Sequence, residues 1–244
     1  MRFKVNPHFK NLGSDNSLKN KVYENIKSMI INGHLKPKER LLEEVLSKAM
    51  NVSRAPIREA LNKLEKEGFV KIFPRKGAIV ADIDIQDVEE IFEIREVLEI
   101  LAIRKSFSKI PLTEIEDIIF KLKEIDKKEN ALALKEEQKS NFLFLDKRFH
   151  QLIRKYYRND RVMQILDNLQ EQMQWFRSVA FEEISVNQSI EEHLSILEAI
   201  KKGDGELAER KLYEHIERAK TSLLNSLISN DHLNSIHEKN KRKD

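Results

Sequence analysis

The chain contains no cysteine among its 244 residues, and this absence excludes disulfide bonds and thiol chemistry. Glycine and proline are scarce, with 6 and 5 residues, while charged residues make up 35% of the chain. No apolar run approaches the ~20 residues that a membrane-spanning helix needs, and the N-terminus carries no signal-like pattern. The composition therefore favours a helical protein, which we expect in the cytoplasm with no membrane partner.

Charge is distributed unevenly along the chain. Residues 1–81 carry 17 Lys or Arg against 8 Asp or Glu, a net charge of +9. Residues 82–244 carry 27 against 33, a net charge of −6. A basic part joined to an acidic part suggests that one half binds a polyanion, in a salt-dependent way because each neutralised phosphate releases counterions.

The run 51–61 combines a helix start, an apolar stripe and two arginines. We expect Ser53 to cap a helix whose first turn accepts Pro56. The buried face is predicted from apolar residues at helical spacing, which are Ile57, Ala60, Leu61 and Leu64. The opposite side carries Arg54, Ala55, Arg58 and Asn62. Such a helix can offer arginines to phosphates and base edges in a DNA major groove, although an arginine pair alone can also be a merely solvated face.

The flanking segments complete a winged helix-turn-helix. A first helix is predicted from the apolar repeat Val22, Ile26, Met29 and Ile30. A short second helix begins at 41–46 and ends near Asn51, a residue type that accepts the left-handed turn conformation. Residues 68–73 and 78–81 are predicted as strands joined by a turn. Arg75 and Lys76 give this hairpin a basic tip that suits a wing on the DNA backbone, the alternative being a solvated turn.

These segments are similar to the DNA-binding domain of GntR-family transcription regulators, over about residues 17 to 82. The shared motif is Leu41-x-Glu43, then Val52-Ser53-Arg54-x-Pro56-Ile57-Arg58-Glu59-Ala60-Leu61-x-x-Leu64-x-x-x-Gly68-Phe69-Val70, then Arg75-Lys76-Gly77-x-x-Val80. The resemblance implies that Arg54 and Arg58 are the chief DNA contacts and that Gly77 belongs to the wing. Two residues depart from the family pattern: Asn51 replaces the usual Gly, and Glu44 stands where some relatives place a DNA-contacting Arg.

From Asp84 onward the pattern predicts helices only. Asp84 and Asp204 are expected to cap the first and last of these helices. Thr113 and Ser189, each followed three residues later by Glu, predict capping boxes at two other helix starts. The fold class is therefore mainly α, with an N-terminal winged helix-turn-helix, a small β-hairpin wing and a C-terminal antiparallel bundle of six or seven helices.

These patterns divide the chain into four parts. We expect a flexible N-terminal arm over 1–16 and a winged helix-turn-helix DNA-binding domain over 17–82. An all-helical effector- and metal-binding domain follows over 83–229, with its last helix running to about residue 228. A polar C-terminal tail occupies 230–244.

Four polar residues in the helical part draw attention. Asp146 and His150 are four residues apart, so both project from one face of one helix. His193 and His215 lie on two further helices, and all three histidines have apolar neighbours in sequence. A single histidine of this kind is usually a hydrogen-bonded core residue, whereas three with an aspartate suggest a shared metal site. The residues alone leave both interpretations open.

The helical part resembles the ligand-binding domain of the FadR subfamily in its metal-containing FCD form, over about residues 85 to 228. The matching segments are Asp146-x-x-Phe149-His150, Glu192-His193-x-x-Ile196-Leu197-Glu198-Ala199-Ile200, Gly203-Asp204 and His215-Ile216. The resemblance implies that Asp146, His150, His193 and His215 hold a divalent metal ion, with open positions for a small carboxylate effector or waters. Nitrogen-rich sites of this kind suit Zn, Ni or Mn.

Arg95 matches an arginine that often lies near the effector pocket in that family. A guanidinium can bind a carboxylate through two parallel hydrogen bonds. The alternative is an ion pair within its own helix with Glu99, four residues on.

The sequence thus predicts a transcription regulator, and we expect a repressor. It would bind a palindromic DNA operator as a homodimer, with a small organic acid modulating its affinity. One rival is a metal-dependent hydrolase fused to a DNA-binding head; against it, the sequence offers no general base near the ligands, no nucleophile motif and no glycine-rich phosphate loop. Another rival is the same regulator with a metal-free effector pocket. The sequence does not identify the effector or the operator, and it does not distinguish repression from activation.

Overall fold

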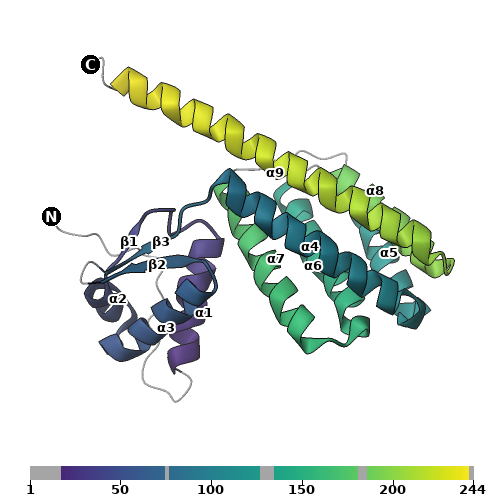
Figure 1. The fold of residues 1–244 in the computed structure, drawn as a ribbon, viewed down its shortest axis with the longest axis horizontal. Coiled ribbons are helices and arrows are strands. Elements are labelled where there is room, and N and C mark those ends of the chain that lie inside the picture. Colours follow the sequence, from purple (N-terminus) through teal and green to yellow (C-terminus); the bar gives the residue numbers. More distant parts are fainter. Residues whose placement is uncertain (1–17, 75–76, 127–134, 181–185, 242–244) are drawn as a thin grey trace. The chain divides into compact units, whose positions relative to one another are not determined.

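The computed structural model describes residues 18–74, 77–126, 135–180 and 186–241, which form helices and one small sheet (Figure 1). The chain divides into two units. The first contains residues 1–88, 168–182 and 226–244, and the second contains residues 89–167 and 183–225. The second half of α7 (Asp160–Ala180) therefore belongs to the first unit.

Three helices form the body of the first unit: α1 (Leu18–Ile31), α2 (Glu43–Met50) and α3 (Arg54–Lys66). Asn51 adopts a left-handed conformation, with φ of 54°, and ends α2 as its residue type predicts. Helix α1 packs against α3, and α2 packs against α3. The apolar stripes meet in a core that includes Val22, Ile26, Ile30, Met50, Ile57, Leu64 and Phe69. The predicted helix-turn-helix is confirmed.

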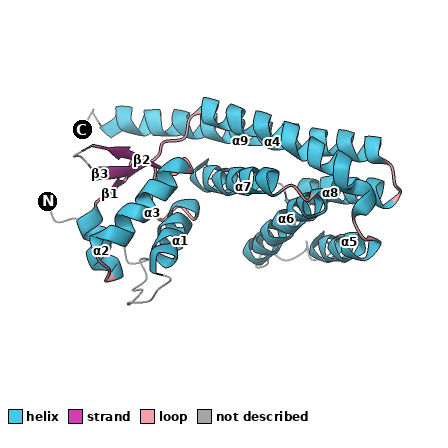
Figure 2. Cartoon of the chain, turned by 60° about the horizontal axis from the view of Figure 1, so that its bottom comes forward, coloured by secondary structure: helices cyan, strands magenta, loops and turns pink. Residues whose placement is uncertain are grey.

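The sheet of the first unit has three antiparallel strands in the order β1-β3-β2 (Figure 2). Strands β2 (Val70–Phe73) and β3 (Gly77–Val80) form the predicted hairpin. Strand β1 (Arg40–Leu41) was not predicted, because two residues are too few to show an alternating pattern. Leu41 was expected to begin the second helix, but α2 begins at Glu43. It pairs Arg40 with Ile79 and Leu41 with Ala78.

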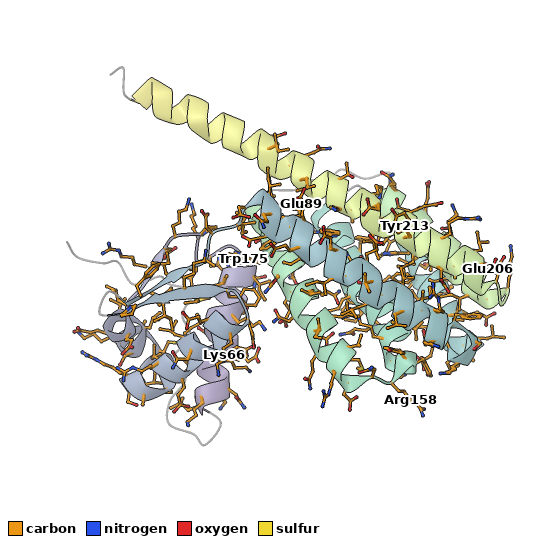
Figure 3. The ribbon with its side chains drawn as sticks, viewed as in Figure 1. Lys66, Glu89, Arg158, Trp175, Glu206 and Tyr213 are labelled. Atoms are coloured by element: carbon orange, nitrogen blue, oxygen red, sulfur yellow. The ribbon has the colours of Figure 1, made fainter. Side chains whose placement is uncertain are left out.

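The second half of α7 packs on the winged-helix part of the first unit. Trp175, labelled in Figure 3, is buried and its ring centroid lies 5.6 Å from that of Phe69. Gln172 Nε2 donates to the main-chain oxygen of Glu67 at the end of α3. These contacts fix α7 to the helix that carries the predicted DNA-contacting arginines.

The second unit consists of helices. Over the described residues, those that follow the sheet are α4 (Ile85–Ser106), η1 (Phe107–Lys109), α5 (Leu112–Asp126), α6 (Lys135–Tyr157), α7, α8 (Val186–Lys201) and α9 (Gly205–Lys241). Helix α5 packs against α6 and α8, and α6 packs against α8. The six α-helices from α4 to α9 agree with the predicted count of six or seven helices after the hairpin. Among the described residues, no helix has both the length and the apolar character needed to cross a membrane.

The predicted helix starts have mixed outcomes. Asp84 Oδ1 accepts a hydrogen bond from the Asp87 amide at 2.8 Å, and Asp204 Oδ1 accepts one from the Leu207 amide at 2.9 Å, so both aspartates cap as predicted. The two predicted capping boxes are wrong, because α5 begins at Leu112 and α8 at Val186, which places Thr113 and Ser189 inside these helices.

Two further predictions about helix ends need correction. Ser53 does occupy the N-cap position of α3, but its side chain makes no capping hydrogen bond. Helix α9 does not end near residue 228 and continues to Lys241, through most of the segment expected to be a polar tail. The predicted N-terminal arm, residues 1–16, lies outside the described residues.

Candidate metal centre and nucleic-acid interface

Four side chains of the second unit converge in its core. Asp146 and His150 lie on α6, His193 on α8 and His215 on α9, and one ligand atom from each lies within 4.8 Å of the other three. The Nε2 atoms of His150 and His193 lie 3.7 and 3.6 Å from Asp146 Oδ1. Atoms bound to one ion at ~2.0–2.2 Å lie at most ~4.4 Å apart, so the widest pair needs to close by only a few tenths of an ångström.

Carboxylates from other helices orient two of the histidine rings. His150 Nδ1 lies 2.7 Å from Glu99 Oε2, and His215 Nδ1 lies 2.7 Å from Glu192 Oε2. A carboxylate can only accept, so each Nδ1 carries the hydrogen and each Nε2 keeps a lone pair directed to the cluster. Arg218 in turn donates to Glu192 through Nε, and its Nη2 donates to Ser189 Oγ. This arrangement, with a carboxylate behind a ligating histidine, is common in protein metal sites.

His193 has no such partner. Its side chain is 0% exposed, and neither ring nitrogen has a hydrogen-bond partner among the described residues. The ring stacks on Phe149 at a centroid distance of 4.2 Å. Burial, together with the nearby His215, lowers the pKa of His193 well below its ordinary value, so the ring is neutral at pH 7. A buried lone pair without a partner is costly, and a metal ion would satisfy it.

Arg95 also reaches the cluster. Its Nε donates to Glu99 Oε1 at 2.6 Å, and its Nη2 lies 3.0 Å from His150 Nε2. The ion pair with Glu99 was one of the two interpretations of this arginine, and the structure contains it. Burial alone raises the pKa of Glu99, but Arg95, His150 and Arg154 outweigh it and hold this pKa well below its ordinary value.

The partners Glu99 and Glu192 were not predicted as part of the site. They lie 51 and 23 residues from the histidines that they hold, and such distances carry no periodic signal. The pair Arg95 and Glu99 at helical spacing was visible, but nothing in the sequence placed His150 beside it. Glu192 directly precedes His193 in sequence, but it accepts the hydrogen bond of His215, which lies on a different helix.

The donor set fits a divalent cation of borderline softness. Three neutral imidazoles and one carboxylate are the ligands that Zn, Ni and Mn accept. Four protein ligands leave room in a five- or six-coordinate ion for oxygen atoms of another molecule. A bound ion there would supply positive charge to attract and hold an anion.

The exposed face of α3 carries the predicted DNA-contacting residues. Ser53, Ala55 and Asn62 are exposed, and the side chains of Arg54 and Arg58 are 61% and 64% exposed. Both arginines have acidic partners on α2: Arg58 donates to both oxygens of Glu43, at 3.0 and 2.9 Å, and Arg54 lies 3.5 Å from Glu44. These pairs are open to water, which screens them, so the guanidinium groups stay available to DNA phosphates.

The wing residues are only partly described. Gly77 begins β3 with φ of +88°, a left-handed conformation that favours glycine, while a Cβ there would meet a methyl group of Leu42 at an ordinary 3.6 Å. The predicted tip residues Arg75 and Lys76 lie outside the described residues.

Comparison with known proteins agrees with this architecture. The model of the bacterial regulatory proteins of the gntR family matches residues 18–80, and the FCD domain model matches residues 90–218. The chain belongs to the GntR family. It is 30% identical over 194 residues to the Bacillus subtilis (strain 168) HTH-type transcriptional regulator YdhC, covering 79% of this chain and 85% of that protein.

Two further proteins are similar to this chain. The Escherichia coli (strain K12) HTH-type transcriptional repressor RspR is 27% identical over 203 residues, covering 83% of this chain and 87% of that protein. The solved structure of E. coli McbR/YncC shares the fold, with a TM-score of 0.68 and 21% identity over 86% of this chain and 99% of that one. The protein is therefore a DNA-binding transcription regulator with an FCD domain, a class of regulator and not of enzyme.

Proposed function

We propose that this regulator is a repressor that binds a palindromic operator as a homodimer and responds to a small carboxylate held beside a divalent metal ion. Asp146, His150, His193 and His215 would hold the ion, and their convergence in a buried core is the observation that carries the proposal. FCD domains are known for metal binding, and RspR, a relative over most of the chain, is named a repressor.

The reading of DNA is assigned to α3. Arg54, Ala55, Arg58 and Asn62 share its exposed face, while Ile57 and Leu64 fix the opposite face in the core. On binding DNA, Arg58 would give up its exposed hydrogen bonds to Glu43 and contact base edges or phosphates instead. A pair of such helices in a two-fold dimer reads two half-sites about one helical turn apart, which makes the operator palindromic.

An apolar surface of the second unit supports the dimer. Ile94 and Val97 on α4 and Tyr213 on α9, labelled in Figure 3, are exposed although they are large and hydrophobic. Val97 and Tyr213, with Ile100 and Leu101, form the apolar part of a cavity of about 650 Å³, whose other lining residues are charged: Glu96, Arg104, Glu206, Glu209 and Arg210. Contiguous exposed apolar surface commonly marks a protein–protein contact, and a second copy of the chain would cover it.

Replacing Arg58 with Ala tests the DNA-reading assignment. The probe is a duplex selected from a random-sequence library with the wild-type protein, and affinity is measured by gel shift at fixed salt. We expect Arg58→Ala to weaken specific binding about 5- to 150-fold, since one bidentate base contact contributes about 1–3 kcal/mol. Lys201→Ala is the control, because Lys201 is an exposed cation of the second unit, paired with Glu116, and lies outside the lining of that cavity. Equal affinity of wild type and Arg58→Ala would remove Arg58 from the interface.

A further inference from the structure

Two ion pairs connect α2 to the exposed arginines of α3, and they differ in geometry. Arg58 donates through Nε and Nη2 to both oxygens of Glu43, at 3.0 and 2.9 Å. Arg54 Nη2 lies 3.5 Å from Glu44 Oε2, which is longer than an ordinary N–H···O hydrogen bond. The side chain of Glu43 is 30% exposed, and that of Glu44 is 57% exposed. Glu44 is therefore the carboxylate of α2 that is more open to exchange its partners for DNA.

A second contact of Glu44 is also open to water. Its Oε1 accepts a hydrogen bond from Lys48 Nζ at 2.9 Å, one helical turn along α2, and the Lys48 side chain is 75% exposed. Water screens an ion pair as exposed as this one, so little opposes its exchange for another donor. Lys48 and then Arg54 lower the pKa of Glu44, so the carboxyl group is ionised at pH 7. The surface thus presents a guanidinium, which only donates, beside a carboxylate, which only accepts.

A donor beside an acceptor matches the major-groove edge of a G·C base pair. This edge presents two acceptors, G N7 and G O6, followed by one donor, the C N4 amine. The Watson–Crick hydrogen bond holds G O6 and C N4 about 3 Å apart, close to the 3.5 Å between Arg54 Nη2 and Glu44 Oε2. An A·T pair instead offers the A N6 donor at the place where the guanidinium needs an acceptor. The order of donor and acceptor therefore favours G·C.

We propose that Arg54 and Glu44 together read one G·C base pair in each half-site, with Arg54 donating to G N7 and O6 and Glu44 accepting from C N4. This inference rests on the proposed function and adds to it a specificity-determining residue, Glu44, from the helix that precedes α3. Glu44 exchanges Lys48 for the cytosine amine. On other sequences the same carboxylate meets no matching donor and is repelled by the phosphates, so it also opposes non-specific binding.

Selection of duplexes from a random-sequence library, carried out with wild type and with each variant, locates the base pair. Glu44→Ala removes the acceptor, and Arg54→Lys keeps the positive charge but loses the two-pronged donor. We expect both variants to lose the preference for G·C at the same single position of each half-site and to keep the preferences at the other positions.

Fluorescence anisotropy at one fixed salt concentration gives the magnitudes. With G·C at that position, wild type should bind about 5- to 150-fold more tightly than with A·T, as bidentate base contacts do. In Glu44→Ala this ratio should be about fivefold smaller, because the acceptor for C N4 is gone. On a duplex that lacks the half-site sequence, Glu44→Ala should bind more tightly than wild type, since a charge that repels phosphates has been removed.

Glu116→Ala is the matched control. Glu116 lies on α5 of the second unit, its side chain is 54% exposed, and it pairs with Lys201 at 2.8 Å. The replacement changes the net charge of the chain by the same amount as Glu44→Ala. Its base preferences and its affinity for the non-specific duplex should remain those of wild type. Circular dichroism melts establish that each variant is folded.

Wild-type base preferences in Glu44→Ala overturn the inference, and so does a change at a different position from the one altered in Arg54→Lys. If Arg58→Ala still weakens specific binding in that case, α3 remains the helix that reads DNA. If Arg58→Ala also binds like wild type, the proposed DNA interface fails together with the inference.

Discussion

At the scale of single residues, His193 differs from an ordinary core histidine, which is usually hydrogen-bonded. Both of its ring nitrogens are buried and have no hydrogen bond among the described residues. Folding removes the hydrogen bonds that water makes to these nitrogens and does not replace them with bonds to other described residues. The neighbouring Phe149 and Phe142 stack on the ring and hold it in place, at centroid distances of 4.2 and 5.8 Å. A side chain kept rigid and neutral at such a cost is suited to ligate an ion.

His193→Leu separates the effect of this histidine on stability from its proposed role in metal binding. Without metal, the leucine variant should melt at the same temperature as wild type or higher, because a desolvated polar group that costs about 1–3 kcal/mol is replaced by an apolar one. With Zn added after chelation, wild type should gain melting temperature and the variant should not. Differential scanning calorimetry with EDTA and with Zn measures both quantities.

The control for His193→Leu is His34→Leu, which changes an exposed histidine of the first unit. This variant should keep the full response to Zn. A metal-induced rise in melting temperature that persists in His193→Leu would show that the ion binds without this residue.

At the scale of elements, the end of α3 depends on Gly68. Its φ is +82°, and a Cβ there would lie 2.8 Å from Nε2 of Gln172, the side chain that bonds the main-chain oxygen of Glu67. Gly68→Ala should therefore cost about 1–2 kcal/mol of backbone strain and roughly 1 kcal/mol more from the lost hydrogen bond. Urea unfolding followed by Trp175 fluorescence reports on this unit, since Trp175 is the single tryptophan of the chain.

Gly33→Ala isolates the backbone strain from the steric effect. Gly33 also has a positive φ, +72°, but a Cβ there would meet Ser178 Oγ at an ordinary 3.7 Å. The free energy of unfolding of Gly33→Ala should therefore fall only by the backbone strain, about 1–2 kcal/mol. Equal losses of unfolding free energy in the two variants would mean that the contact of α7 with the end of α3 contributes nothing to stability.

The elements were predictable where their signal is local. The stripe of α3, the left-handed Asn51 and the caps Asp84 and Asp204 depend on residues within one or two turns, and all four are present as predicted. Strand β1 was missed, because its pairing with β3 joins residues nearly forty positions apart. The capping boxes failed because the Ser and Thr preceded Glu by chance inside helices that begin earlier.

The candidate site was predictable only in part, for the same reason. One helix places Asp146 and His150 on the same face by spacing alone, but the approach of His193 and His215 came from the family resemblance. The carboxylates that orient the rings, Glu99 and Glu192, belong to other helices than the histidines they hold. Contacts between helices depend on packing, which one sequence does not display.

At the scale of the whole molecule, the basic and acidic halves of the sequence correspond to different tasks. The part that reads DNA carries the net positive charge, so operator binding should weaken steeply as salt increases. Helix α7 contributes Asp167, which binds Arg154, to the second unit and Gln172, which binds the end of α3, to the first. One continuous helix thus contributes side chains to both units. The proposed effector response requires that binding in one unit be coupled to binding in the other.

The test of this coupling is operator affinity measured with and without metal at one fixed salt concentration. If a coupling of about 1–3 kcal/mol connects the two sites, loading stripped protein with Zn and acetate should change operator affinity about 5- to 150-fold. His193→Leu should show no change under the same treatment, because it lacks a ligand of the proposed ion. Fluorescence anisotropy with the selected duplex gives these affinities. Identical operator affinity in stripped and loaded wild-type protein, with calorimetry showing that the ion is bound, would reduce the metal to a structural role.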